Sequence, residues 1–214
     1  MDALPINAQQ YLPLLISEIR THWPGTPLPS VLAAQVEQET CSKLTSQKCW
    51  SPHAELKTSR EYGFGLGQLT ITARFNRFED AKALHLTLKT WQWQHRYDPQ
   101  KQLRTLVLMD KALFHQFEAA TLLDQLAFTL SAYNGGVSGM RNDRKLCTQI
   151  EACDAKQWFG HVEKYSLKQR TKVNGYGQSF YDINRTYVRI VLKVRREKYV
   201  PYMDRAVENI KRGT

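Results

Sequence analysis

The sequence predicts a mainly α-helical protein in which a short β-like or loop region interrupts the helices. Apolar residues between Glu118 and Asn134 recur at the i, i+3, i+4, i+7 spacing of a buried helix. By contrast, the stretch "EYGFGLGQLTITARF" places three glycines in five positions and then β-branched residues, which is typical of a loop or a short β-like turn. With 214 residues, 42% of them hydrophobic, the chain is expected to form a single globular domain over residues 1–214.

The N-terminal half is predicted to contain three helices. Asn7 is expected to cap a helix that runs to about Thr21, and the "WPGTPLP" segment then breaks the chain. Apolar spacing predicts a second helix over residues 30–39. Residues 41–62 are interpreted as an irregular excursion, and residues 78–98 are predicted to be helical up to "HRYDPQ".

The C-terminal half begins with the buried helix over residues 118–134, which the glycine pair 135–136 should stop. A cysteine-bearing loop and the glycine-aromatic loop "GYGQSFYD" follow it. Asn184 is expected to cap a helix over residues 185–198, and Pro201 to start a last helix toward Gly213.

The formal charge of +10 and the pI near 9.5 indicate attraction to a polyanion, which could be nucleic acid, anionic lipid or an acidic envelope polymer. A solvated basic face that only keeps the protein soluble is the competing interpretation. A nucleic-acid-binding or structural protein would use "YVRIVLKVRREKYVPY" as its contact helix. Since no zinc-finger, helix-turn-helix or RNA-binding motif accompanies that segment, no nucleic-acid partner is expected.

The four cysteines form two close pairs, Cys41 with Cys49 and Cys147 with Cys153. Even number and local pairing favour two small-loop disulfides, which imply an oxidising compartment. Free thiols and a zinc site are the alternatives, but neither spacing is CxxC. No metal and no other cofactor is expected.

Neither a membrane-spanning helix nor Sec export is expected from this sequence. No apolar run approaches the roughly 18 residues that a spanning helix needs. The N-terminal "MDALPINAQQYLPLLISEIR" has no basic region, no uninterrupted apolar region and no small-residue cleavage site, so Sec export is not expected.

Two acids close the helix over residues 30–39, and only one of them can face a given site. On a helix, Glu37 and Glu39 diverge by about 200°. If Leu32 and Val36 face the core, Glu39 lies on their side and Glu37 points toward water. A helix C-terminus and low-dielectric neighbours both raise the pKa of a carboxyl group, as a general acid working near neutral pH requires. A solvated helix end is the alternative for Glu39.

Two further stretches offer groups that suit a sugar ligand. In "GFGLGQL", the glycines would let the backbone approach a ligand, and the Gln68 amide suits hydroxyl and acetamide groups. In "AYNGG", the Tyr133 hydroxyl could orient a carboxyl group and Asn134 could bind an acetamide. A plain tight turn and a helix C-cap with a core ring are the alternatives.

In this order, the three motifs resemble the catalytic domain of the soluble lytic transglycosylase family, which shares its lysozyme-like fold with goose-type lysozymes. Glu39–Thr40 is similar to the family's Glu-Ser pair, and Gly65–Gln68 with Thr72–Ala73 is similar to its "GLMQ" loop and Thr-Ala pair. Ala132–Gly136 is similar to its "AYNAG" helix end, and Asn184–Val188 resembles its late "ETRNYV" helix.

The likeness covers about residues 30–195 and implies a mainly α (α+β lysozyme-like) domain that cleaves the MurNAc–GlcNAc β-1,4 bond of peptidoglycan. It implies Glu39 as the catalytic residue, first general acid and then base, with 1,6-anhydroMurNAc ends as product. The substrate-binding residues that it implies are Thr40, Gly67, Gln68, Tyr133, Asn134 and Tyr187. Peptidoglycan glycan strands are the expected partner, the basic charge could add association with an anionic envelope, and a monomer is expected.

The sequence departs from the family pattern at four places. Thr40 keeps the hydroxyl of the family's Ser, whereas Gly67 in place of Met removes an apolar wall. About ten extra residues after the Glu hold the Cys41/Cys49 pair and are interpreted as a stapled insertion. The Glu of "ETRNYV" is absent, because Ile183 stands at that place.

Glu61, just before the glycine loop, is a candidate second carboxylate. If it faces the cleft it could activate water, and the enzyme would then be a hydrolysing muramidase or chitinase. A surface charge is the alternative for Glu61.

Disulfides without an export signal suggest a bacteriophage lysis protein. Such an endolysin, or a virion-delivered lysin, acts in the periplasm or cell wall of the host and crosses the inner membrane through a holin pore or arrives with the virion. A bacterial enzyme without its leader is the alternative.

Overall fold

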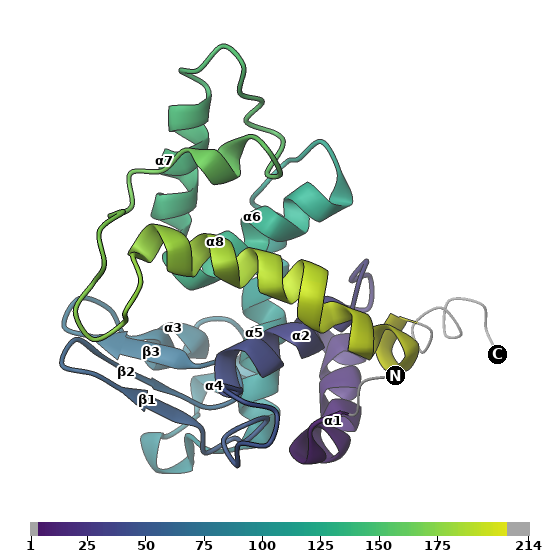
Figure 1. Cartoon of the computed structure of the whole chain (residues 1–214). Coiled ribbons are helices and arrows are strands. Elements are labelled where there is room, and N and C mark those ends of the chain that lie inside the picture. The colour runs from purple at the N-terminus through teal and green to yellow at the C-terminus, as the bar shows by residue number, and fades with distance from the viewer. Residues whose placement is uncertain (1–3, 205–214) are drawn as a thin grey trace. The chain divides into compact units, whose positions relative to one another are not determined.

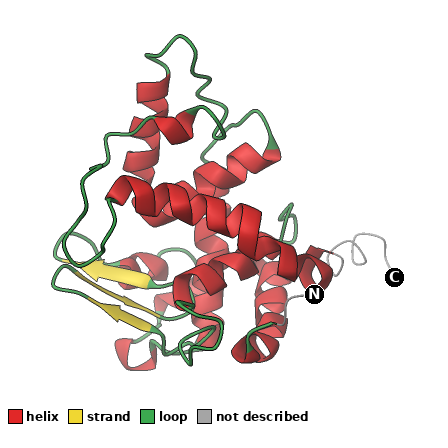
Figure 2. Cartoon of the chain, in the orientation of Figure 1, coloured by secondary structure: helices red, strands yellow, loops and turns green. Residues whose placement is uncertain are grey.

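The computed structural model describes residues 4–204 as a mostly helical protein with one small antiparallel sheet, which confirms the mainly α fold class (Figures 1 and 2). The chain divides into two compact units. The first comprises Met1–Met109 with Lys193–Thr214, and the second is Asp110–Leu192. The domain predicted over residues 1–214 is therefore organised so that the C-terminal segment belongs to the same unit as the N-terminal half.

The first unit opens with α1 (Ile6–His22), whose apolar face buries Leu12, Leu15 and Ile19. The predicted cap at Asn7 is wrong, because the helix already begins at Ile6 and no side chain caps it. Asn7 instead donates from Nδ2 to the carbonyl of Cys49, at 2.9 Å. Its side chain therefore holds a distant loop rather than the start of the helix.

The second helix, α2 (Ser30–Thr40), confirms the helix predicted over residues 30–39. Its residues from Ser30 to Glu37 are all buried, so this helix has no solvent face over most of its length. Glu37, near its end, therefore meets protein rather than water.

Three short strands form an antiparallel sheet in the order β1-β2-β3: β1 (Glu55–Lys57), β2 (Glu61–Phe64) and β3 (Leu69–Thr72). The β-like region after α2 was predicted, but β1 was not, because three residues are too few to show an alternating pattern. The irregular excursion predicted over residues 41–62 therefore contains a strand. One face of the sheet packs on a cluster formed by Phe64, Leu69, Phe78, Ala81, Leu88 and Trp91.

The helix predicted over residues 78–98 is wrong as a continuous element. It is divided into α3 (Arg77–Lys82), α4 (Leu86–Lys89) and a 3₁₀ turn, Trp93–His95. Side chains of Asn76 and His85 accept hydrogen bonds from backbone amides at the starts of α3 and α4. Each cap starts a new helix.

A longer helix, α5 (Pro99–Phe114), was not predicted. Asp98 accepts a hydrogen bond from the Lys101 amide at 3.1 Å, and Pro99 takes the first helical position. "HRYDPQ" thus contains the cap and first-turn proline that open a helix, rather than the end of one.

The second unit contains the predicted buried helix as α6 (Leu122–Gly135), capped by Thr121 and followed by Gly136 at φ +83°. A further helix, α7 (Val137–Cys147), was not predicted, and a 3₁₀ turn forms at Val162–Lys164. The α7 helix occupies part of the region that was interpreted as a cysteine-bearing loop.

The last long helix is α8 (Phe180–Ile190), which continues through a π turn, Val191–Arg195, into a 3₁₀ turn, Arg196–Tyr199. The predicted cap at Asn184 is wrong, because Ser179 caps the helix by accepting from the Asp182 amide at 3.0 Å. The helix predicted from Pro201 toward Gly213 lies mostly outside the described residues.

Both predicted disulfides are present, Cys41–Cys49 in the first unit and Cys147–Cys153 in the second. Within residues 4–204, no helix has the length and apolarity needed to cross a membrane.

Candidate active site

Glu39 lies in the last turn of α2, one residue before the helix ends at Thr40, and its side chain is half-buried. No basic residue stands in that last turn. A carboxyl group at a helix C-terminus faces the negative end of the helix dipole, which favours its protonated form. The structure thus places Glu39 at the end of the helix predicted over residues 30–39, and its role as general acid stays a prediction.

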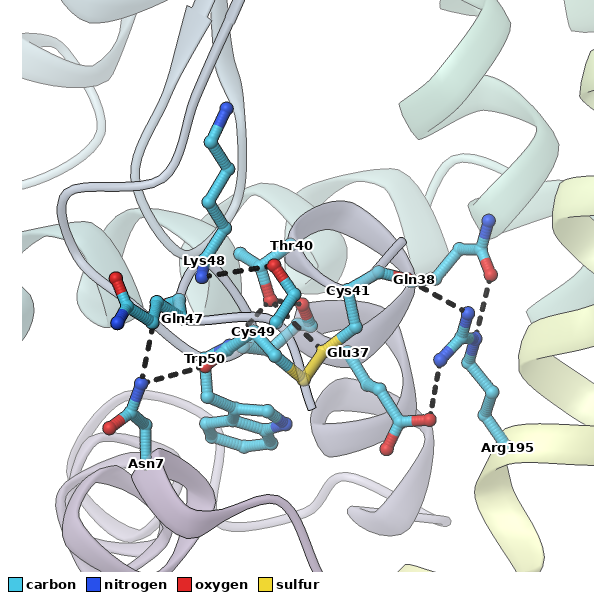
Figure 3. The surroundings of a disulfide bond; sticks show 12 residues. Asn7, Glu37, Gln38, Thr40, Cys41, Gln47, Lys48, Cys49, Trp50 and Arg195 are labelled. Atoms are coloured by element: carbon cyan, nitrogen blue, oxygen red, sulfur yellow. Dashed lines mark hydrogen bonds and ion pairs between the residues drawn. A yellow bond between two sulfur atoms is a disulfide. The ribbon is translucent and has the colours of Figure 1, made fainter. Parts of the chain in front are cut away.

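Thr40 uses its hydroxyl inside the protein. Oγ1 donates to the carbonyl of Val36 at 2.7 Å and accepts from the Trp50 amide at 2.8 Å, and the residue is 5% exposed (Figure 3). The family resemblance implied a substrate contact for this residue. In the structure its hydroxyl connects the end of the disulfide loop to the helix that carries Glu39.

A short segment then connects this helix end to the glycine loop. It begins at Trp50, which is bonded to Thr40, and ends at Ala54, whose carbonyl accepts from the Gly65 amide at 2.8 Å and from Gln68 Nε2 at 3.0 Å. A chain advances at most about 3.6 Å per residue, so four residues span no more than about 14 Å. One short segment thus connects the end of α2, to which its first residue is hydrogen-bonded, with the glycine loop, to which its last residue is hydrogen-bonded.

The glycine loop, Gly63–Gln68, turns between β2 and β3 and is held by a residue that the sequence did not identify. Gln102 of α5 is 1% exposed, accepts from the Leu66 amide at 2.9 Å, and donates to the carbonyls of Pro52 and Arg96, each at 2.9 Å. No local pattern marks it, because a glutamine on a helix is ordinarily a surface residue.

Gln68 lies at the end of this loop and is half-buried. It has φ +44°, and its Nε2 donates to the carbonyls of Ala54 and Gly65. Its Oε1 accepts no hydrogen bond from the described residues, so this oxygen remains an acceptor. A Cβ on Gly63 would lie 3.0 Å from that oxygen, so glycine leaves room beside it. Gly67 is buried in the same loop.

Glu61 shares a sheet face with this loop. It pairs with Thr72 across β2 and β3, and Gly63, two residues later on β2, pairs with Thr70. Side chains two apart on a strand point to the same face, so Glu61 faces the side where Gln68 Oε1 lies, while Tyr62 and Phe64 face the core. Glu61 is half-buried.

A third carboxylate on the sheet, Glu55, was not identified from the sequence. It accepts hydrogen bonds from the hydroxyls of Tyr62 and Tyr97, and Arg96 stacks over Tyr97 with its guanidinium 4.2 Å from the ring centroid. The hydrogen bond from Tyr62, followed by that from Tyr97, holds the pKa of Glu55 below its usual value. Glu55 is therefore held ionised and is no candidate for a general acid.

Glu37 contradicts the prediction that it points toward water. Glu37 is fully buried, and its Oε1 lies 2.5 Å from Arg195 Nη1 (Figure 3). The same oxygen lies 2.9 Å from Lys198 Nζ. Its Oε2 accepts from the Tyr199 hydroxyl at 2.5 Å. The prediction assumed a solvent face on α2, but the C-terminal segment covers that face.

Tyr199 in turn connects Glu37 to the segment after the disulfide loop. Its hydroxyl accepts from Trp50 Nε1 at 2.9 Å while it donates to Glu37. Burial, followed by the charge of Glu37, raises the pKa of the Tyr199 hydroxyl, so Tyr199 keeps its proton and remains a donor.

In the second unit, the "AYNGG" motif forms the end of α6 as expected. Tyr133 is half-buried and Asn134 is exposed. Asn134 Oδ1 accepts from Asn184 Nδ2 at 3.0 Å, which leaves the Asn134 amide nitrogen as the group that can donate outward. Tyr187, three residues after Asn184 on the same face of α8, is 5% exposed.

Asn184 has the role of a buried connector between α6 and α8 instead of a cap. It is 1% exposed, donates to the Ser131 carbonyl at 3.0 Å, and accepts from the Ser131 hydroxyl at 2.8 Å. A Cβ on Gly135 would lie 2.8 Å from Asn184 Nδ2 and 2.9 Å from Lys168 Cε. The glycine of this motif is therefore needed for close packing.

Lys168 belongs to a buried charge cluster around Asp143, which is 1% exposed. Asp143 Oδ2 lies 2.9 Å from both Lys168 Nζ and Arg185 Nη2, and its Oδ1 accepts from Ser166 at 2.7 Å. Burial lowers the pKa of Lys168. This cluster holds the 166–168 segment beside α7 and the end of α6.

The residues implied by the family resemblance are thus divided between the two units. Glu39, Thr40, Gly67, Gln68 and Glu61 lie in the first unit, and Tyr133, Asn134 and Tyr187 lie in the second. Among residues 4–204, no group of three or more His, Cys, Asp or Glu side chains is arranged to hold a metal ion.

Searches against models of known protein families and against curated protein sequences find no match to this chain.

Proposed function

We propose that this protein is a peptidoglycan-cleaving lytic transglycosylase in which Glu39 acts first as general acid and then as general base. The proposal is supported by the ordered motifs of the sequence and by one observation of the structure. The hydrogen bonds of Trp50 to Thr40, and of Ala54 to Gly65 and Gln68, tie the glycine loop to the end of the helix that carries Glu39.

In the proposed reaction one carboxyl group performs both proton transfers. Protonated Glu39 gives its proton to the glycosidic oxygen as the bond from that oxygen to the anomeric carbon of MurNAc breaks. The ionised Glu39 then takes the proton of the muramoyl 6-hydroxyl, whose oxygen bonds to the anomeric carbon. Glu39 returns to its protonated form, no water is consumed, and the product carries a 1,6-anhydro ring.

The remaining residues are proposed to hold the glycan. Gln68 Oε1 would accept from a sugar N–H or hydroxyl, and the exposed Asn134 amide would donate to an acetamide carbonyl. Tyr133 would orient a carboxyl group of the substrate. Gly67 would let the glycan approach the loop backbone, and Tyr187 of α8 would be a further glycan-binding residue, as the family resemblance implies.

A second candidate function is a hydrolase of the same substrate, or a chitinase. The observation that favours it is the shared sheet face of Glu61 and the Gln68 amide oxygen. A carboxylate on that face could activate a water molecule for attack on the anomeric carbon.

Mass spectrometry of muropeptides released from purified sacculi tests both candidates. Ends with a 1,6-anhydro ring are expected for the transglycosylase, and reducing ends would favour the hydrolase. Glu39→Gln should abolish nearly all release while the circular dichroism spectrum and Tm stay unchanged. Glu61→Gln should keep the release of a transglycosylase, whereas it should abolish that of a hydrolase that uses Glu61 as its second carboxylate. Substantial lysis by Glu39→Gln would reject the assignment.

The proposed place of action is the periplasm or cell wall of a bacterial host, during phage lysis or infection. The two disulfides support an oxidising compartment. Detection of the protein in purified virions would indicate a virion-associated lysin, whereas its restriction to infected cells would indicate an endolysin.

A further inference from the structure

Arg195, from the C-terminal segment of the first unit, forms hydrogen bonds with three residues at the end of α2. Its Nη1 lies 2.5 Å from Glu37 Oε1, its Nε donates to Gln38 Oε1 at 2.8 Å, and its Nη2 donates to the Cys41 carbonyl at 3.3 Å (Figure 3). These contacts fall on both sides of Glu39 in the sequence.

The contact with Cys41 satisfies a backbone group that helix geometry leaves open. The last carbonyls around a helix C-terminus have no partner within the helix, and a cation there also interacts favourably with the dipole. The last turn of α2 contains no basic residue of its own. Arg195 supplies that charge from a position 154 residues away in the sequence.

Glu37 fixes Arg195 in this position. A buried carboxylate is costly unless it is paired and hydrogen-bonded, and Glu37 is fully buried with two cations and the Tyr199 hydroxyl around it. The Arg195 side chain is only 18% exposed, and its donors point at protein groups rather than at solvent.

Lys198 provides an internal comparison. Its ammonium also pairs with Glu37 Oε1, at 2.9 Å, and its side chain is 9% exposed. In the described part of the chain it bonds to Glu37 alone, and it contacts neither Gln38 nor Cys41. The two cations therefore share the buried ion pair but differ in whether they hold the residues around Glu39.

We propose that Arg195 is a positioning residue, which sets the orientation of the Glu39 carboxyl group by holding Gln38 and the Cys41 carbonyl. This inference rests on the proposed function of Glu39. A displacement of about 1 Å in a catalytic group can lower a rate by about 100-fold. Removal of these three contacts of Arg195 should thus lower kcat while KM for the glycan stays the same.

The matched variants are Arg195→Met and Lys198→Met, which each remove one cation from Glu37 and keep the aliphatic stem. Initial rates on purified sacculi, at saturating and subsaturating concentrations, separate kcat from KM. We expect kcat to fall at least about tenfold in Arg195→Met and less than about threefold in Lys198→Met, with KM within about twofold of wild type in both. Thermal unfolding should show a loss of Tm in both variants, because both weaken the same buried pair, and a larger loss in Arg195→Met, which also removes the hydrogen bonds to Gln38 and Cys41.

Arg195→Lys separates positioning from stability. A lysine can pair with Glu37, but its single ammonium cannot reproduce the planar fork that reaches all three groups. Its Tm should therefore recover toward wild type while kcat remains at least about fivefold reduced. A variant that recovers both Tm and kcat would overturn the inference, as would equal losses of kcat in the two methionine variants. If Arg195→Met does not fold, Arg195→Lys and Lys198→Met decide the question.

Hydrogen exchange of the peptide covering residues 36–44 provides a readout that needs no activity. Exchange of the amides of residues 38–41 should accelerate in Arg195→Lys but not in Lys198→Met, and unchanged exchange in both would overturn the inference. A wild-type protein that releases nothing from sacculi would contradict the proposed function, and the exchange result would still decide whether Arg195 holds this turn.

Discussion

Gly65 and Gln102 approach so closely that a Cβ on Gly65 would lie 2.5 Å from the Gln102 amide carbon. Gly65 also has φ +80°, in the region that side-chain-bearing residues rarely adopt. Since Gln102 bonds the loop at Leu66 and the carbonyls of Pro52 and Arg96, the glycine and the buried glutamine form one rigid support for the candidate glycan-binding loop.

Substitution Gly65→Ala should therefore destabilise the protein by at least about 3 kcal/mol, from backbone strain and from the clash with a buried, fully bonded side chain. Gly175→Ala is the control, because Gly175 has φ +87° but no atom within 4 Å of an added Cβ. Strain alone should cost about 1–2 kcal/mol there. Urea unfolding measures both, and equal losses would show that the Gln102 contact is unimportant.

The two disulfides should differ in their effect on activity while they contribute similarly to stability. Their sequence separations are 8 and 6 residues, for which loop entropy predicts about 2–3 kcal/mol each. Cys41–Cys49 closes the loop next to Glu39. Its replacement by serines should therefore lower the lytic rate at least about threefold when the rate is measured at a temperature below the Tm of the variant. Replacement of Cys147 and Cys153 should leave the rate within about twofold of wild type. Equal rates for the two double variants would contradict this prediction.

Stability at acid pH should depend on Glu55. Hydrogen bonds from Tyr62 and Tyr97 lower its pKa in the folded protein, so the ionised carboxylate stabilises the fold at neutral pH. That contribution is lost as the pH falls below the usual glutamate range and through the lowered pKa. Glu55→Gln should thus show a lower Tm at pH 7 and a smaller loss of Tm between pH 6 and pH 3 than wild type.

Glu151→Gln is the control for this series, because Glu151 is exposed and accepts no hydrogen bond from the described residues. Its Tm should follow that of wild type across the pH range. A Glu55→Gln variant whose Tm falls with pH as steeply as that of wild type would show that the two tyrosines do not couple to this carboxylate.

Elements with strong local signals were predictable. The helix at residues 30–39 and the buried helix that ends at Gly135 have long periodic apolar patterns, and both are present as α2 and α6. The disulfides followed from close spacing along the chain. Shorter elements were missed. β1 has only three residues, and residues 78–98 show one continuous helical pattern although side-chain caps divide this region into separate short helices.

By itself, the sequence determined the helical class, the two cysteine pairs and Glu39 as the candidate acid, because each depends on residues close together along the chain. Only the tertiary structure decided the roles of Glu37, Thr40, Gln102 and Asn184. Arg195, for example, lies 158 residues after Glu37, and a helical pattern cannot show that a distant segment will cover the presumed solvent face of α2. The buried Glu37 carboxylate is stable there only because this distant segment brings the compensating cations to it.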